Sequence, residues 1–110
     1  MPGDEVRSID RRRSPRVPAS IPVLVQGQTR SGEEFSIKTR THTVSQFGCL
    51  ILLNVEVFVD HRVVLTREDL HQTIEGKFVS TWRHSDGRRF AGVAFSSAAQ
   101  DFWRVAMPKA

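Results

Sequence analysis

The sequence predicts an all-β fold, a six-stranded antiparallel β-barrel followed by a short C-terminal helix. Short apolar or alternating segments follow one another closely along the 110 residues, as strands do in a small β-domain. Turn-forming residues separate these segments, and only the last stretch has helical spacing. Closing such strands into a barrel removes the exposed edges that an open sheet would leave unpaired.

Size and composition indicate one globular domain. The chain has 110 residues, of which 39% are hydrophobic and 25% charged, and a chain of this length buries a single core without disulfides or metal. No run approaches the roughly 20 apolar residues of a membrane helix, and the N-terminus lacks the apolar segment of a signal peptide. We therefore expect a cytoplasmic protein with no membrane span.

The first ten residues differ in character from the rest of the chain. Residues 1–10 are polar and contain Pro2 and Gly3, so we expect a flexible N-terminal tail. Residues 11–110 are expected to form the barrel domain with its terminal helix.

The first predicted strands lie between Ile21 and Val44. IPVLVQ is short and β-branched, which favours a strand. GQTRSGE follows, and its Gly27 and Gly32 predict a turn. EFSIKTRTHTV then alternates, and we expect one face of that strand to carry Phe35, Ile37, Thr39, Thr41 and Thr43.

The middle of the chain predicts four more strands, the last two of them joined as a hairpin. GCLILL is a continuous apolar run containing Cys49, which we expect to be a small buried hydrophobic residue. VEVFVDHRVVLT follows, and we expect its RVVLT part to pair as a strand. TIEGKFVSTWRH is long enough for an extended strand with a bulge or bend at Gly76. SDG at 85–87 predicts a tight turn, after which RRFAGVAF returns as the partner strand.

The last stretch, SAAQDFWRVAM, predicts a helix at about 97–107. Ser96 or Ser97 is a suitable N-cap, and Pro108 ends the helix. We expect the apolar residues of this helix to lie against the barrel.

No catalytic or metal-binding pattern is present, so we expect neither an enzyme nor a cofactor. No glycine-rich phosphate loop precedes a helix, and nothing specific supports a Ser/His/Asp triad. The histidines lack the spacing of metal ligands; they are His42, His61, His71 and His84.

Arginine is concentrated in one short stretch, RRRSPR at 11–16. The whole chain has 16 Lys plus Arg against 12 Asp plus Glu, a net charge of +4. Arginine offers a planar fork of donors that suits phosphates and the edge of guanine. On charge alone, the simpler interpretation is a solvated basic arm, or one drawn weakly to nucleic acid or acidic lipid.

Two motifs stand in a particular order around the first strands. Arg12 and Arg16 form RxxxR ahead of a strand, and TVSQFGCLI places Ser45 and Gly48 in SxxG spacing about thirty residues later. FVSTWRH, a hairpin, RRFAGVAF and a helix containing FW follow. In this combination the chain, from about Arg11 to Trp103, resembles the PilZ domain family of bacterial receptors for the second messenger cyclic di-GMP.

The resemblance implies a six-stranded barrel with a C-terminal helix, and a ligand site on its surface. In the family, the RxxxR arginines clasp guanine and phosphate groups, and [Asp or Asn]-x-Ser-x-x-Gly holds the other guanine. The implied ligand is cyclic di-GMP, and the implied partner is an unidentified effector protein. The site residues that the resemblance implies are Arg12 and Arg16, then Ser45 and Gly48, with Arg11 and Arg13 adding charge or stacking.

One position departs from the family motif, because Thr43 stands where the family has Asp or Asn. A carboxylate accepts hydrogen bonds from both donors on guanine's Watson–Crick edge, whereas a hydroxyl offers less. The loss of a hydrogen bond to a charged group costs about 1.5–3 kcal/mol. A complex with a micromolar Kd has a binding free energy of about −8 kcal/mol, so we expect Thr43 to weaken binding rather than abolish it. Threonine also simply continues the predicted strand face.

Two alternatives to a cyclic di-GMP receptor and adaptor remain open. The first is a PilZ-like module for protein–protein contact that no longer binds the nucleotide, which Thr43 favours and the retained arginines oppose. The second is a barrel that binds RNA or single-stranded DNA, which requires exposed aromatic residues among basic ones. The chain has no tyrosine, so we expect no nucleic-acid polymer as partner. Core or turn positions are expected for Phe35, Phe47, Phe78, Phe90 and Phe95.

Overall fold

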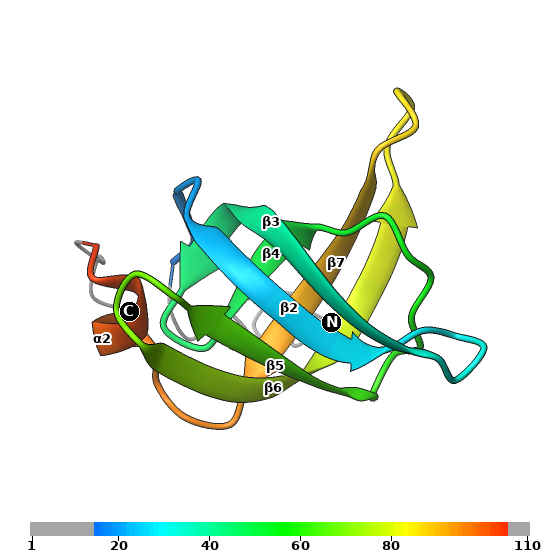
Figure 1. The fold of residues 1–110 in the computed structure, drawn as a ribbon. Helices are drawn as coiled ribbons and strands as arrows, with labels where there is room; N and C mark the ends of the chain where they lie inside the picture. The colour runs from blue at the N-terminus through cyan, green and yellow to red at the C-terminus, as the bar shows by residue number, and fades with distance from the viewer. Residues whose placement is uncertain (1–14, 106–110) are drawn as a thin grey trace, which may run out of the picture.

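Antiparallel strands form a closed six-stranded barrel in the computed structural model, which describes residues 15–105 (Figure 1). The strands pair in the order β3-β2-β5-β6-β7-β4, and β4 pairs back with β3 to complete the closure. The predicted fold class is confirmed. The elements are β1 (Val17–Pro18), β2 (Pro22–Gln28), β3 (Glu34–Ser45), β4 (Gly48–Leu52), β5 (Arg62–Arg67), β6 (Gln72–Arg83), β7 (Arg89–Phe95) and α2 (Gln100–Trp103).

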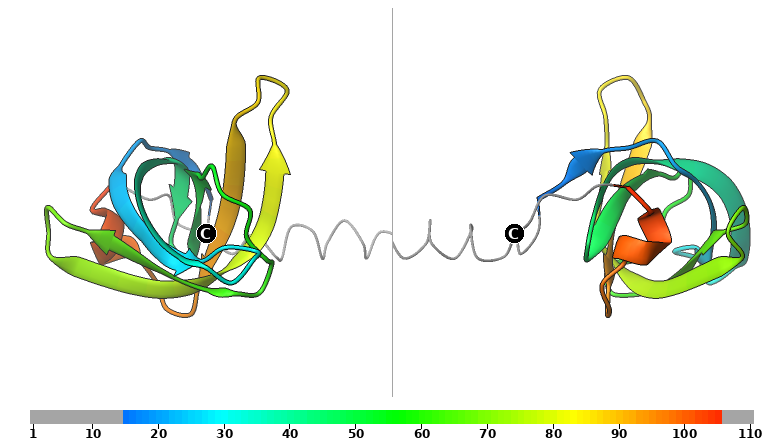
Figure 2. Two further views of the ribbon diagram at one scale, coloured as in Figure 1. Left: turned by 45° about the vertical axis from the view of Figure 1, so that its right-hand side comes forward. Right: turned by 90° about the vertical axis from the view of Figure 1, so that its left-hand side faces the viewer.

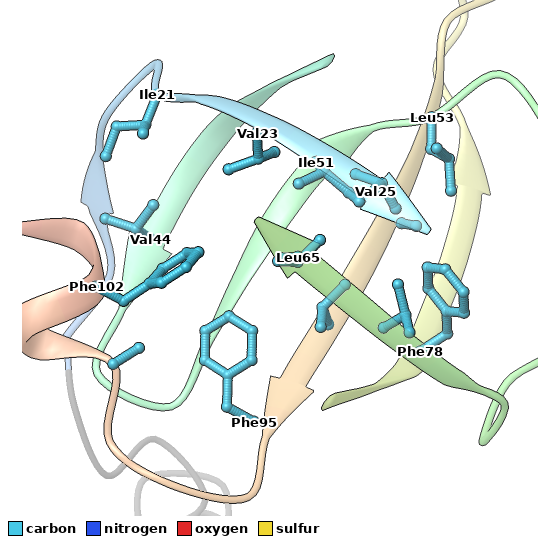
Figure 3. Close-up of a cluster of buried hydrophobic side chains, with 14 of the residues drawn as sticks. Ile21, Val23, Val25, Val44, Ile51, Leu53, Leu65, Phe78, Phe95 and Phe102 are labelled. Atoms are coloured by element: carbon cyan, nitrogen blue, oxygen red, sulfur yellow. The ribbon is translucent and has the colours of Figure 1, made fainter. Parts of the chain in front are cut away.

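Alternate residues of the strands point inward and fill the barrel (Figure 3). Val25, Ile51 and Leu65 have no exposed surface, and neither does Phe78. A Leu→Ala substitution at such a position costs about 2–5 kcal/mol, because the surrounding strands cannot collapse into the cavity. The barrel is therefore a packed core, and a ligand must bind elsewhere.

The short helix α2 lies in one open end of the barrel (Figure 2). Phe102 and Trp103 are 5% and 1% exposed, and they close that end of the core. The expectation that the apolar helix residues lie against the barrel is confirmed for these two. The helix is shorter than predicted, Gln100–Trp103 instead of about 97–107. Arg104 adopts a left-handed backbone conformation, with φ of 57°, which ends the helix.

A buried arginine fixes α2 to the barrel. Arg67 at the end of β5 is 9% exposed, and its Nη1 donates to the carbonyl oxygens of Phe102 at 3.1 Å and Trp103 at 2.9 Å. The other side of the guanidinium forms two bonds with the Asp69 carboxylate, at 3.1 and 2.7 Å. This pairing holds the pKa of Asp69 below its ordinary value, chiefly through the side-chain hydrogen bond. The last carbonyls of α2 thus have a charged donor.

The strand β3 contains a bulge that changes which side chains face outward. Its pairing with β4 shifts register between Thr41 and Thr43, so the alternation that starts at Phe35 is broken. Val44 becomes buried at 1% exposure, while Thr43 is only half-buried. The expectation that Thr43 shares the inward face of Thr39 and Thr41 is therefore wrong.

The second long strand, β6, also has a bulge, but not where the sequence suggested. Its register with β7 shifts between Phe78 and Ser80 rather than at Gly76. A Cβ on Gly76 would lie 2.3 Å from the carbonyl oxygen of Ala94, so close strand packing requires glycine there. Beyond the bulge, the β6–β7 hairpin projects from the barrel (Figure 1), and its predicted turn at 85–87 is confirmed. Within residues 15–105, no helix has the length and apolarity to cross a membrane.

Candidate functional site

A pocket of about 300 Å³ lies on the outer surface of the barrel, over β3, β4, β6 and β7. It is lined by the residue just before β1, by the turn between β3 and β4, and by the base of the projecting β6–β7 hairpin. Its lining consists of Arg16, Thr43, Val44, Ser45, Phe47, Gly48, Cys49, Leu50, Val79, Ser80, Trp82, Gly92, Val93 and Ala94.

Arg16 reaches this pocket because β1 pairs antiparallel with the end of β3. Val17 lies opposite Val44 in that pairing, so the preceding residue, Arg16, lies beside Ser45. The arginine is exposed. Arg16 of the first motif and Ser45 of the second are far apart in the sequence, and both line the same pocket.

A buried threonine fixes the path of the chain after β1. The Thr41 hydroxyl donates to the carbonyl oxygen of Ala19 and accepts from the backbone N–H of Ile21 at 2.9 Å. Thr41 is 4% exposed, so these bonds satisfy its only polar group inside the protein. They hold the link between β1 and β2 against β3, and thereby help to place Arg16 beside the pocket.

The bulge in β3 turns the second motif toward the pocket. Thr43 and Ser45 both line it, although Val44 between them is buried in the core. The Ser45 hydroxyl lies 3.4 Å from the carbonyl oxygen of Gly48, a long hydrogen bond. Ser45 therefore has a donor that a ligand can redirect.

Gly48 is required by strand packing as well as by its place in the pocket. A Cβ there would lie 2.4 Å from the carbonyl oxygen of Val93 on β7. Gly92, opposite Leu50 on β4, differs because its Cβ would meet the Ser80 hydroxyl at 2.5 Å. The Ser80 side chain lines the pocket, so the absence of a Cβ at Gly92 keeps the pocket floor open.

The turn between β3 and β4 is held by the C-terminal segment. The Trp103 indole donates to the Ser45 carbonyl oxygen at 2.9 Å. The Ala99 N–H donates to Gln46 at 2.6 Å, and the Phe95 N–H donates to Phe47 at 2.9 Å. Three successive carbonyls of the turn thus have partners from the end of β7 onward, so the barrel end and the pocket wall form one bonded unit.

Two aromatic side chains border the pocket, and sequence reasoning did not assign either of them to the site. Phe47 is 36% exposed and Trp82 44%, high values for large apolar side chains. The Trp82 ring stacks on Phe90 at a centroid distance of 5.4 Å. His42 also contacts Phe90, at 5.5 Å. The tryptophan within FVSTWRH was the available signal, but the β6 bulge hides which face it occupies.

The described pocket lining offers one guanidinium, the hydroxyl groups of Thr43, Ser45 and Ser80, and apolar surface. Arg16 is the charged residue among the described residues that line the pocket, and none of them is acidic. Cys49 is the lining thiol, and burial raises its pKa far above the ordinary value. Because a thiol must ionise to act as a nucleophile, this shift makes Cys49 a poor nucleophile, although the residue is half-buried rather than fully buried as expected. Among residues 15–105 no group of three His, Cys, Asp or Glu side chains is placed to hold a metal ion.

The structure brings together four of the seven predicted site residues. Arg16, Thr43, Ser45 and Gly48 line the pocket. The other three, Arg11, Arg12 and Arg13, lie outside the described residues.

A family model described as "PilZ domain" matches residues 10–102 of this chain. No curated protein sequence matches this chain. Similar solved structures include the inhibitor of motility MotI (DgrA) of Bacillus subtilis, at TM-score 0.62 and 16% identity over 84% of this chain and 46% of that one. The MrkH–c-di-GMP complex of K. pneumoniae has TM-score 0.58 and 18% identity, over 84% of this chain and 48% of the other.

Escherichia coli YcgR in complex with c-di-GMP is a third similar structure, at TM-score 0.56 and 18% identity, over 77% of this chain and 38% of YcgR. At these identities the likeness concerns the fold. This chain spans less than half the length of each of the three proteins.

Proposed function

This chain belongs to the PilZ domain family, and we propose that it is a receptor that binds cyclic di-GMP in the pocket beside Arg16. MrkH and YcgR, two proteins of similar fold, are described as complexes with this nucleotide. Cyclic di-GMP has two guanines and two phosphates. A receptor for it needs forked cationic donors and flat surfaces for stacking.

The observation that carries the proposal is that Arg16, Ser45 and Gly48 line one pocket. They come from the two sequence motifs, which are far apart along the chain. A barrel needs neither an exposed arginine at the start of β1 nor an outward serine after a bulge. Their convergence therefore supports a ligand site rather than two unrelated structural features.

The Arg16 guanidinium fits either a phosphate or the N7 and O6 acceptors of guanine, because both accept a planar pair of donors. The pocket, at about 300 Å³, is at the small end of ligand pockets, so we assign it one guanosine half of the ligand. Arg12, one RxxxR spacing earlier, would hold the phosphates or the second base. Arg11 and Arg13 would add charge.

The exposed ring of Trp82 supplies a stacking surface for guanine. Phe90 already supports one face of Trp82, which keeps the indole from rotating freely. A base stacked on an aromatic side chain gains about 1–3 kcal/mol. Trp82 therefore adds a contact that the two sequence motifs do not contain.

A second candidate function is a protein-interaction module that does not bind the nucleotide. Thr43 favours it, because the family motif has Asp or Asn there and the Thr43 side chain does line the pocket. Under this alternative, neither the wild type nor an Arg16 variant would bind the nucleotide.

In the receptor hypothesis, cyclic di-GMP bridges the arginine-rich segment and the barrel wall. A ligand that binds both in one arrangement favours that arrangement over the others. The ordered segment would then present a new surface to an effector protein. The output of the signal is set by that partner.

Isothermal titration calorimetry with cyclic di-GMP tests the proposal directly. We expect binding by the wild type at or below the order of tens of micromolar, with Arg16→Ala removing most of it. Arg16→Lys should also fail, because a point charge cannot replace the planar fork. Arg62→Ala is the matched control, since Arg62 pairs with Glu75 outside the pocket. No heat with the folded wild type would end the receptor hypothesis.

A further inference from the structure

A second cationic site lies on the other face of the β6–β7 hairpin, and Trp82 is the one described lining residue that it shares with the pocket described above. A cavity of about 200 Å³ is lined there by the arginine cluster, which we define as Arg30, Arg83 and Arg89 with the single carboxylate of Glu56. The four residues come from the turn after β2, from β6, from β7 and from the loop after β4. Convergence of like charges from separate elements requires an explanation.

Two of these arginines are direct neighbours across the hairpin. Arg83 of β6 lies opposite Arg89 of β7. Side chains at opposite positions of an antiparallel pair share one face with Cβ atoms about 5 Å apart, and like charges there are destabilising. The hairpin thus carries a pair of positive charges that its own stability disfavours.

The cluster has fewer carboxylates than guanidinium groups. Glu56 Oε2 lies 3.1 Å from Arg89 Nη1, and the three arginines together hold the pKa of Glu56 below its ordinary value, with the Arg89 hydrogen bond as the largest cause. Within residues 15–105, neither Arg30 nor Arg83 forms an ion pair. The nearby Asp86 is already bonded to Arg88 at 2.7 Å. Three cations therefore share one carboxylate.

The edge of β6 beside this cluster is open. β5 pairs with β6 only from Gln72 to Lys77, and loop residues complete the pairing at Phe78. Among the described residues, the segment 80–83 pairs with β7 alone. Its opposite edge presents backbone donors and acceptors in the projecting part of the hairpin (Figure 1), where an extended chain can add as a further strand.

We propose that the arginine cluster and the open β6 edge form a docking surface for an acidic, extended segment of a partner protein. Carboxylates match the guanidinium fork in two-point geometry. Glu56 shows which ligand chemistry the cluster accepts, because its own carboxylate binds Arg89 there. Acidic side chains of the partner would supply the counter-charges that Arg30 and Arg83 lack. This surface does not depend on nucleotide binding.

The test is an ¹⁵N NMR titration of the full chain, without nucleotide, with a capped hexaglutamate peptide and with hexaglutamine as the uncharged control. Hexaglutamate should shift the amides of 80–83, Arg89, Glu56 and Arg30. Hexaglutamine should not. Shifts confined to Arg16 and Val17 would mean that only the N-terminal arginines attract the peptide, and would overturn the proposal.

Two substitutions give opposite expected signs. Arg83→Gln should weaken hexaglutamate binding by about twofold to fivefold, the range of an exposed ion pair. Glu56→Gln should strengthen it by a similar factor, because it removes the competing carboxylate and nearly preserves shape. Lys38→Gln is the control, since Lys38 is 77% exposed and pairs with Glu68 elsewhere. Weaker or unchanged binding by Glu56→Gln would contradict the proposal, and so would tighter binding of hexauridylate RNA to the same amides.

Discussion

The indole Nε1 of Trp103 donates a hydrogen bond to the backbone carbonyl oxygen of Ser45 at 2.9 Å. The residue that closes the core thus also holds the turn that carries the second motif. α2 is in turn fixed by Arg67, whose guanidinium bonds the last two carbonyls of the helix. Helix docking and pocket geometry are therefore parts of one arrangement.

Trp103→Phe keeps a large ring but removes the N–H donor. We expect it to lower the free energy of unfolding by about 1–3 kcal/mol, because the Ser45 carbonyl loses its partner and the smaller ring leaves a cavity. We also expect weaker cyclic di-GMP binding. Urea denaturation and calorimetry measure the two effects.

Phe102→Leu is the matched control for that substitution. Phe102 is buried beside Trp103, so its truncation should reduce stability while leaving the Trp103–Ser45 bond in place. The account requires that only Trp103→Phe reduces affinity; an equal loss in both variants would show that the bond does not position the site.

Thr43→Asp restores the carboxylate of the family motif. Since Thr43 lines the pocket beside Ser45, we expect tighter cyclic di-GMP binding, by about tenfold or more, the value of one hydrogen bond to a charged group. Thr43→Val, which has a similar shape but no hydroxyl, should bind more weakly than wild type. Unchanged affinity in Thr43→Asp would place the guanine edge away from this position.

Two pocket glycines should respond differently to alanine. Gly48→Ala puts a Cβ against the Val93 carbonyl, a backbone atom that cannot move aside, and we expect a loss of about 1–3 kcal/mol in stability. Gly92→Ala clashes only with the Ser80 hydroxyl, at 2.5 Å, and this group can rotate away. This second variant should stay folded, with weaker nucleotide binding because the methyl group fills the pocket floor. Thermal melts with calorimetry separate the two effects.

Acid should weaken the attachment of α2 through Asp69. The pKa of this carboxyl is lowered in the folded protein, mainly by its hydrogen bond from Arg67. Its stabilising contribution is therefore complete above the unfolded-state pKa, about 4, and is lost as pH falls through the folded-state pKa. We expect the stability difference between wild type and Asp69→Asn to shrink toward zero below about pH 4. A difference that stays constant with pH would rule out this role.

The strands and their closure into a barrel were predictable because alternation and turn residues are local signals. The outward direction of Thr43 was not, because one extra residue in β3 reverses the alternation and only the pairing with β4 reveals it. The same applies to Trp82, which follows the bulge in β6. A bulge leaves no specific residue type in the sequence.

The role of Arg67 was also hidden. It follows an apolar strand and precedes Glu68 and Asp69, so it has the pattern of a solvated charge. Its burial depends on α2, because its guanidinium donates hydrogen bonds to the last two carbonyls of that helix. The local sequence pattern does not indicate contacts between segments so far apart along the chain. The length of α2 depended likewise on the backbone conformation of Arg104.

The most direct measurement is an ¹⁵N NMR titration of this chain with cyclic di-GMP. The account predicts saturable shifts of the amides of Arg16, of 43–48 and of Trp82, together with those of 11–13, while the amides of Arg30, Glu56 and Arg89 respond little. Shifts that appear at Arg16 but not at 43–48, or no shifts at all, would contradict the claim that the two motifs bind one nucleotide.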